Sequence, residues 1–160
     1  MKKSIDLGCG ANIKNPFGAE LLYGIDVRED LEKNIYKADL VIDKIPIEDN
    51  FFDYVTAFDF IEHIPRLIYC PGRRYPFVEL MNEIWRVLKP GGIFLSVTPA
   101  APHLQVFQDP THVNFITEET YEKYFDERYL WGKMYGFNGS FSLEKQYWNS
   151  FQLISHLRKS

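Results

Sequence analysis

Four short, nearly continuous apolar runs dominate the first 60 residues, and each one stops at a glycine or an acidic residue. Apolar runs without an alternating pattern are typical of parallel strands that are buried on both faces of a sheet. Ligand groups gather at the carboxyl ends of such strands, which is where the glycine and the acids stand. The pattern therefore predicts an α/β fold with a mostly parallel, doubly wound sheet. The runs cover residues 4–7, 21–25, 38–43 and 54–58, and they stop at Gly8, Asp26, Asp43 and Asp59.

The second half of the chain predicts a long helix, another strand and a terminal hairpin. Apolar residues recur at helical spacing over residues 77–88, and residues 93–98 follow as a strand. A further helix is expected to start near Thr117, a residue type that suits an N-cap. Residues 141–147 and 151–157 alternate between polar and apolar, so we expect an antiparallel β-hairpin at the C-terminus.

Size and composition favour one globular domain over residues 1–160. Apolar residues make up 46% of the chain and charged residues 25%, which are ordinary globular values. The sequence has no apolar run of the roughly 18–20 residues that a membrane span needs, no room for a signal peptide, and only two cysteines, so we expect a cytoplasmic protein. The net charge of −4 argues against nucleic acid as a partner, because phosphate backbones are usually bound by a basic face.

The first turn has the layout of a nucleotide site. The sequence IDLGCGAN follows the first predicted strand, and Asp26 ends the second one, twenty residues beyond Asp6. Gly8 permits a tight turn, Gly10 lets the backbone approach a ligand, and an acid at the next strand end can accept ribose hydroxyl groups. Ile13 stands where a dinucleotide fingerprint needs its third glycine, which weakens a nicotinamide oxidoreductase as the interpretation.

The order of the motifs is more specific than any one of them. The chain contains DLGCG, then GIDV, DNFFDYVTAF, FIEHI and EIWRVLKPGGIFLSVTP. This order closely resembles the class I S-adenosylmethionine-dependent methyltransferases, above all the small members similar to methyltransferase domain type 11. The likeness covers residues 4–99 and implies a Rossmann-like methyltransferase fold with S-adenosyl-L-methionine as the cofactor. Substrate would then be covered by the segments 65–76 and 100–140.

The resemblance also implies which residues hold the cofactor. The motif that contains Asp6, Gly8, Cys9 and Gly10 would wrap the methionine end, and Asp26 would hold the ribose. Asp43 resembles the acid beside the adenine, with Ile45 or Ile47 lining the ring, and Asp39 is a rival for that role. Phe58 and Asp59, at the end of the fourth predicted strand, would face the methionine moiety and the incoming substrate.

The sequence departs from the family pattern in the first turn. Asn12 replaces the third glycine of the family's GxGxG, although asparagine tolerates a left-handed conformation. Only about ten residues, 11–20, separate the turn from the second strand, so the usual first helix should be shortened or absent. The helix dipole that normally faces the cofactor's carboxylate would then be lost, and Lys14 is a candidate cation to replace it.

Methyl transfer to a hydroxyl benefits from a base, and histidines are the first candidates. We expect His112, in FQDPTHVNF, to be the base, and His63 of FIEHI is the second candidate. Asp109 is expected to take part in catalysis beside His112, and Asn114 to bind the substrate. Arg73 and Arg74 would suit a phosphate or carboxylate on the acceptor. The spacing of His103, Asp109 and His112 matches no zinc pattern, so no metal is expected.

The leading hypothesis is an enzyme that methylates an oxygen of a small polar acceptor such as a glycan, a nucleotide-sugar or another metabolite, with a nitrogen as the less favoured acceptor atom. Methylation of RNA or DNA is one alternative. A non-catalytic, methyltransferase-like binding subunit is another, because the first turn departs from the family. Aromatic residues make up 16% of the chain and cluster in its last third, where they would suit a substrate pocket or a homodimer surface.

Overall fold

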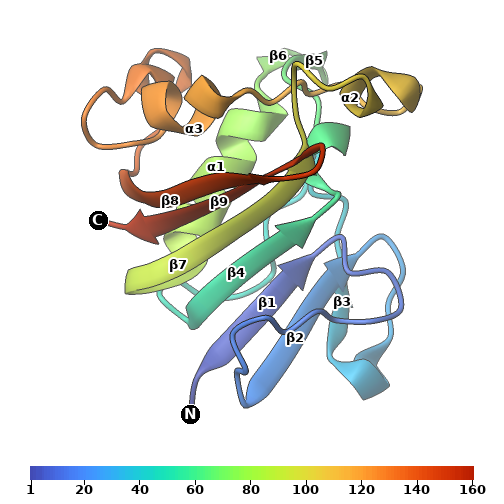
Figure 1. The fold of residues 1–160 in the computed structure, drawn as a ribbon. Helices are drawn as coiled ribbons and strands as arrows, with labels where there is room; N and C mark the ends of the chain where they lie inside the picture. The colour runs from blue at the N-terminus through green and yellow to red at the C-terminus, as the bar shows by residue number, and fades with distance from the viewer.

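A computed structural model describes all of residues 1–160, and its centre is a seven-stranded sheet (Figure 1). The strand order is β3-β2-β1-β4-β7-β9-β8. The first five strands in that order are parallel, whereas β9 runs antiparallel to both β7 and β8. The sheet strands are β1 (Lys3–Leu7), β2 (Leu21–Asp26), β3 (Ile35–Lys37), β4 (Phe52–Phe58), β7 (Leu88–Pro99), β8 (Phe141–Asn149) and β9 (Gln152–Lys159).

This topology confirms the α/β class and the C-terminal antiparallel hairpin. It also corrects the third strand, which was expected over residues 38–43 but spans Ile35–Lys37. Residues 38–43 turn instead, because the side chain of Asp39 accepts a hydrogen bond from the backbone N–H of Val41 and that of Asp43 accepts one from the N–H of Asp39. Such local side-chain bonds compete with strand pairing.

One helix forms the main packing partner of the sheet. Helix α1 (Pro76–Val87) begins with proline at a position where a free N–H is not needed. Its apolar stripe confirms the predicted helix, shifted by one residue, and it is buried against the sheet. The buried stripe consists of Phe77, Leu80, Met81, Ile84 and Val87. Helix α3 (Glu118–Tyr124) joins it on the same face, where the Tyr121 hydroxyl donates to Ser96 of β7.

Both helices cover one face of the sheet, and the opposite face carries none (Figure 1). The predicted loss of the first helix is confirmed, since residues 8–20 form a loop in front of β1 and β2 (Figure 1). Asp6 accepts a hydrogen bond from the backbone N–H of Lys14, and Asn15 both donates to and accepts from the backbone of Ala19. The Phe17 ring stacks on Tyr54 of β4 at 4.3 Å, so an aromatic pair replaces part of the packing of a helix.

The remaining elements are short, and η1 directly precedes β3 at its amino end. A two-stranded ribbon of β5 (Ile68–Tyr69) and β6 (Arg73–Arg74) precedes α1. The other short elements are η1 (Leu31–Lys33), η2 (Ile61–His63), α2 (Gln105–Gln108) and η3 (Trp131–Tyr135). None of the helices combines the length and apolar character that crossing a membrane would require.

Candidate functional site

A cavity of about 330 Å³ opens at the carboxyl ends of β1, β2 and β4. Its walls come from the turn after β1, the end of β2, the turn after β3 and the segment that follows β4. Parallel α/β sheets bind their ligands at this edge. The lining residues are Gly8, Ile25, Asp26, Val27, Ala38, Asp39, Leu40, Val41, Asp59, Phe60, His63 and Ile64.

Two glycines shape the turn at the mouth of the cavity. Gly8 has a φ of +65°, and a Cβ at this position would lie 2.2 Å from Cδ2 of Phe60, so a side chain does not fit. Gly10 has a φ of +59° and open space around it, and its backbone N–H donates to Asp26 at 3.0 Å. Asn12 has no left-handed backbone, so it does not reproduce the conformation allowed to the family's third glycine.

Asp6 and Cys9 lie next to this turn but do not line the cavity. Burial raises the pKa of the Asp6 carboxyl, although the N–H of Lys14 and the hydroxyl of Thr56 oppose the shift by donating to it. Burial, followed by the nearby Asp6 and Asp26, raises the pKa of the Cys9 thiol to about 11. Cys9 is therefore a neutral packing residue and Asp6 fixes the loop.

Of the two acids that were candidates for the adenine side, Asp39 lines the cavity and Asp43 does not. Asp39 lines the cavity together with Leu40 and Val41, whereas Asp43 uses its carboxylate to cap the backbone of Asp39. Ile45 is 2% exposed and belongs to the hydrophobic core. The structure thus places Asp43 and Ile45 outside the cavity and brings the rival acid into it.

The segment after β4 forms the opposite wall. Asp59 has a φ of +49°, lines the cavity and accepts a hydrogen bond from Gln152. Phe58 faces the other way, where the Lys14 ammonium lies 4.5 Å from its ring centroid. The Lys14 ammonium therefore lies against an aromatic ring at the end of β4.

The three predicted catalytic residues form one cluster at the edge of the cavity. The rings of His63 and His112 lie 4.9 Å apart, and Asp109 Oδ2 is 3.9 Å from His112 Nε2. His112 Nδ1 lies 3.0 Å from the carbonyl of Val106, and His63 Nδ1 lies 3.1 Å from the Thr111 hydroxyl. Neither Nε2 atom makes a hydrogen bond, so both remain open to a ligand.

Glu62 completes this cluster, and it was not among the predicted site residues although it stands beside His63 in the FIEHI motif. Its side chain is 1% exposed, and one oxygen, Oε2, accepts from the Thr98 hydroxyl at 2.8 Å. The other oxygen, Oε1, has no hydrogen-bond partner. Burial raises the pKa of this carboxyl, and the bond from Thr98 and the neighbouring His63 only partly oppose the shift.

Asn114 is the residue that holds the cluster together. It is fully buried, its amide donates to the carbonyl of Ile61, and its carbonyl oxygen accepts from Arg66 at 2.8 Å. The backbone N–H groups of Val113 and Asn114 both donate to the carbonyl of Glu62. Asn114 thus has no polar atom free for a substrate and joins the segment 109–116 to η2.

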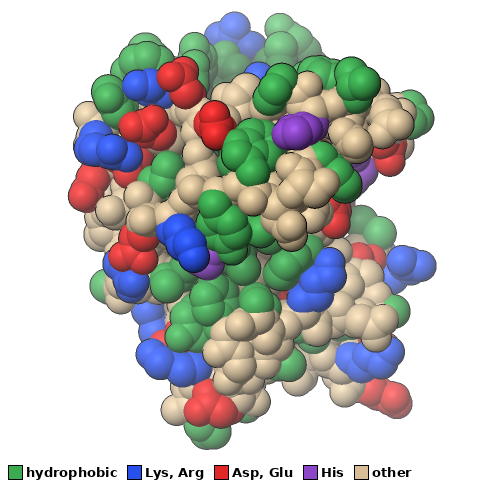
Figure 2. All heavy atoms as spheres, in the orientation of Figure 1, with side chains coloured by type: hydrophobic (Ala, Val, Ile, Leu, Met, Phe, Trp, Pro, Cys, Tyr) green, Lys and Arg blue, Asp and Glu red, His purple; other side chains and the backbone are tan.

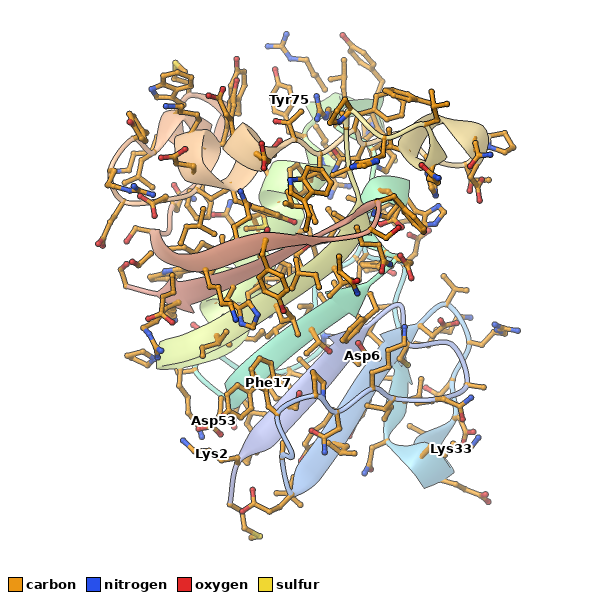
Figure 3. All side chains as sticks on the ribbon, viewed as in Figure 1. Lys2, Asp6, Phe17, Lys33, Asp53 and Tyr75 are labelled. Atoms are coloured by element: carbon orange, nitrogen blue, oxygen red, sulfur yellow. The ribbon has the colours of Figure 1, made fainter.

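The predicted arginine pair does not reach the cavity. Arg74 pairs with Glu79 and also donates to the carbonyl of Ile42, and Arg73 stacks on Tyr75 with 5.7 Å to the ring centroid (Tyr75 is labelled in Figure 3). Sequence reasoning also missed several apolar wall residues. Val27 and Ile64 directly follow an acid or a histidine of the site, but only the fold shows that they face the cavity.

Comparisons with known proteins show the family of this chain. A family described as "Methyltransferase domain" (type 11) matches residues 5–96. Demethylmenaquinone methyltransferase of Staphylococcus aureus is 34% identical over 65 residues, which are 41% of this chain and 23% of that enzyme. The chain therefore spans about a quarter of the length of the curated relatives it matches.

Solved structures share the fold at low identity. A S-adenosylmethionine-dependent methyltransferase from Archaeoglobus fulgidus superposes with a TM-score of 0.61 at 15% identity, covering 99% of this chain and 86% of that one. A methyltransferase crystallised with the activator Trm112 from Haloferax volcanii gives a TM-score of 0.65 at 14% identity, with 99% and 82% covered. The chain belongs to the class I S-adenosylmethionine-dependent methyltransferases, in the type 11 methyltransferase domain family.

The residues of the cavity fit the cofactor of this family. Asp26 and Asp39 offer carboxylates for sugar hydroxyl groups, and the apolar side chains of Val27, Val41 and Ile64 would suit a nucleobase. Gly8 has no side chain, so the backbone of the turn can come close to a bound ligand. S-adenosyl-L-methionine is thus supported both by the family and by the shape of this site.

Proposed function

We propose that this protein transfers a methyl group from S-adenosylmethionine to a hydroxyl oxygen of a small polar acceptor. The observation that carries the proposal is the pair of histidines at the edge of the cavity, each with an unbonded Nε2. His63 also lines the cavity itself, so a group bound there can touch it. A hydroxyl needs a base to lose its proton, and imidazole is the usual one.

In this proposal the residues that line the cavity bind the cofactor. Asp26 would accept hydrogen bonds from the ribose hydroxyls, and Asp39 would lie beside the adenine with Leu40 and Ile64 against the ring. Gly8 and Gly10 would let the backbone approach the methionine end. When bound, S-adenosylmethionine supplies an activated methyl group, whose transfer depends mainly on alignment with the nucleophile.

The histidine cluster would then deprotonate the acceptor. The contact of Nδ1 with the Val106 carbonyl fixes the proton of His112 on Nδ1, so its Nε2 carries a lone pair. The acceptor oxygen would give its proton to an Nε2 as the carbon–oxygen bond forms. Asp109, 3.9 Å from His112 Nε2, would stabilise the imidazolium that results.

The rim beside the cluster would contact the rest of the acceptor. Phe107 and Phe115 pack against each other with centroids 5.0 Å apart, and both stay exposed. Flat exposed rings of this kind can stack on a sugar or a phenol. We therefore expect an acceptor that presents a hydroxyl next to a flat or ring-shaped body.

The test is transfer of labelled methyl to three acceptor classes, sugars, phenols and amines, followed by mass spectrometry. We expect product from a hydroxyl acceptor and a loss of kcat on the order of 100-fold in both His63→Ala and His112→Ala. His103→Ala is the matched control, because His103 packs on Trp148 outside the cluster and should keep full activity. Methylation of amines alone, or unchanged kcat in both histidine variants, would overturn the proposal.

A further inference from the structure

Three side chains of the kinds that bind transition metals converge at the edge of the cavity. Glu62 and His63 belong to η2, and His112 comes from the segment after α2, about fifty residues later in the chain. One ligand atom from each lies within 4.8 Å of the other two. This set differs from the His103, Asp109 and His112 set that was considered for zinc in the sequence. Glu62 and His63 are adjacent, and only the fold brings His112 to them.

The orientation of both imidazoles suits a metal ligand. A histidine that binds a metal through one nitrogen usually donates its other N–H to a carbonyl or carboxylate, which fixes the ring. His112 Nδ1 lies 3.0 Å from the Val106 carbonyl, and His63 Nδ1 lies 3.3 Å from the carbonyl of Thr111. Each Nδ1 thus has an oxygen partner, and neither Nε2 makes a hydrogen bond, although Asp109 Oδ2 lies 3.9 Å from His112 Nε2.

The carboxylate of Glu62 gives the independent indication of a ligand. Its side chain is buried, and its Oε1 has no hydrogen-bond partner in the structure. An unpartnered carboxylate oxygen in the interior is costly, and buried charges are normally paired or coordinate a metal. Thr98 holds the other oxygen at 2.8 Å and thereby keeps the carboxylate in place.

We propose that Glu62, His63 and His112 together bind one divalent transition-metal ion. Two imidazole nitrogens and one carboxylate favour ions such as Zn²⁺, Co²⁺, Fe²⁺ or Mn²⁺ over Mg²⁺ and Ca²⁺, which prefer oxygen ligands. Bonds of about 2.1 Å place neighbouring ligand atoms roughly 3–3.5 Å apart, so binding draws the three side chains inward. His63 is half-buried.

Three protein ligands leave coordination positions open, as catalytic metal sites do. Because His63 lines the cavity, an open position would face an acceptor oxygen there. A bound divalent ion lowers the pKa of a coordinated hydroxyl and would take over the activation that a free imidazole performs otherwise. This consequence rests on the proposed function, whereas the binding of the ion does not.

The test is a titration of Co²⁺ into the full, untagged chain after dialysis against a chelator, followed by visible absorption. We expect one ion per chain with d–d bands, displaced by Zn²⁺, and an affinity at least ~10-fold lower in both Glu62→Gln and His112→Ala. His103→Ala is the control and should bind as the wild type. His63→Ala provides a second reading if Glu62→Gln does not give a folded protein by circular dichroism.

The outcomes separate this inference from the proposed function. Absence of the d–d bands, or the same Co²⁺ affinity in the wild type and His112→Ala, would overturn the metal site. Methyl transfer that persists in chelator but depends on His63 would retain the proposed function and overturn the catalytic use of the ion. Co²⁺ binding with the expected variant pattern, but without transfer to any hydroxyl, would retain the site and reject the proposed function.

Discussion

The sheet has two hollows of similar size at its opposite ends, and they differ in how their charged side chains are paired. The hollow at the amino ends of β1, β4 and β7 measures about 280 Å³, against about 330 Å³ at the carboxyl ends. At the amino ends, Lys2 and Lys89 both bind Asp53, at 3.0 and 2.8 Å (Lys2 and Asp53 are labelled in Figure 3). Arg158 pairs with Glu144 and donates to the carbonyl of Gly91.

The carboxyl-end cavity differs in its unused groups. Glu62 Oε1 and the Nε2 atoms of His63 and His112 have no hydrogen-bond partner there. The two hollows have similar volumes but differ in chemistry. The charged side chains at the amino ends pair with one another and stabilise the fold, whereas the polar atoms at the carboxyl ends are free to bind a ligand.

The space-filling view shows the helix-free face of the molecule, with apolar side chains gathered over its centre and charged ones around them (Figure 2).

The largest effect is expected from a side chain at the mouth of the carboxyl-end cavity. Gly8→Val forces a left-handed conformation on a branched residue, at a cost of about 1–2 kcal/mol, and its Cβ would displace the Phe60 ring into the cavity. We expect affinity for S-adenosylmethionine to fall at least ~100-fold by isothermal titration calorimetry. Gly72→Ala, where nothing lies within 4 Å, is the control and should bind normally. Tight cofactor binding by Gly8→Val would show that the cofactor does not approach this turn.

A smaller effect is expected from the acid that faces both the turn and the cavity. Asp26→Ala removes the acceptor of the Gly10 N–H, 3.0 Å away, along with the carboxylate offered to ribose hydroxyls. We expect cofactor affinity to fall about 10- to 30-fold, the equivalent of roughly 1.5–2 kcal/mol. Asp30→Ala removes a half-buried acid that pairs with Lys33 (labelled in Figure 3) outside the cavity, and it should leave affinity unchanged. Equal affinity in Asp26→Ala and the wild type would place the ribose elsewhere.

The smallest effect is expected at the amino ends, and it concerns stability alone. Burial would raise the pKa of Asp53, but hydrogen bonds from Lys89, the backbone N–H of Lys3 and Lys2 lower it well below its ordinary value of 3.8. The ionised carboxylate therefore stabilises the fold above about pH 4, and this contribution is lost as the pH falls through the lowered pKa.

We expect Asp53→Asn to lower the free energy of unfolding by roughly 1 kcal/mol at pH 7, because hydrogen bonds to a charged group are lost. Urea unfolding at pH 7 and at pH 2 measures the difference, which should shrink at the lower pH. Cofactor affinity should not change. A loss of stability that grows as the pH falls would contradict the pairing, and a loss of cofactor affinity would contradict the division between the two hollows.

The lining of the carboxyl-end cavity was largely predictable from the sequence, because many of its residues stand at strand ends within local motifs. Gly8, Asp26 and Asp59 directly follow or end apolar runs, so the end of each strand also predicted a residue of the cavity. Asp39 was harder to assign, because strand β3 is short and the residues after it turn on their own side chains. Because of these local bonds, Asp39 lines the cavity instead of Asp43, which lies four residues later.

The histidine cluster was predictable only in part, because tertiary contacts build it. His63 and His112 were candidates, but their contact depends on buried Asn114, which bonds both Ile61 and Arg66. Glu62 looks like an ordinary surface acid in the sequence, and only the fold shows that it is buried with a free oxygen. The absence of helices on one face followed from the short connection between β1 and β2, whereas the stacking of Phe17 on Tyr54 did not.

We propose that the carboxyl-end cavity, and not the amino-end hollow, binds S-adenosylmethionine. Isothermal titration of the cofactor into the wild type, Asp26→Ala and Asp53→Asn distinguishes the two. We expect saturable one-to-one binding that weakens in Asp26→Ala and is unchanged in Asp53→Asn. Absence of binding to the wild type at millimolar cofactor, or a weakening confined to Asp53→Asn, would contradict it.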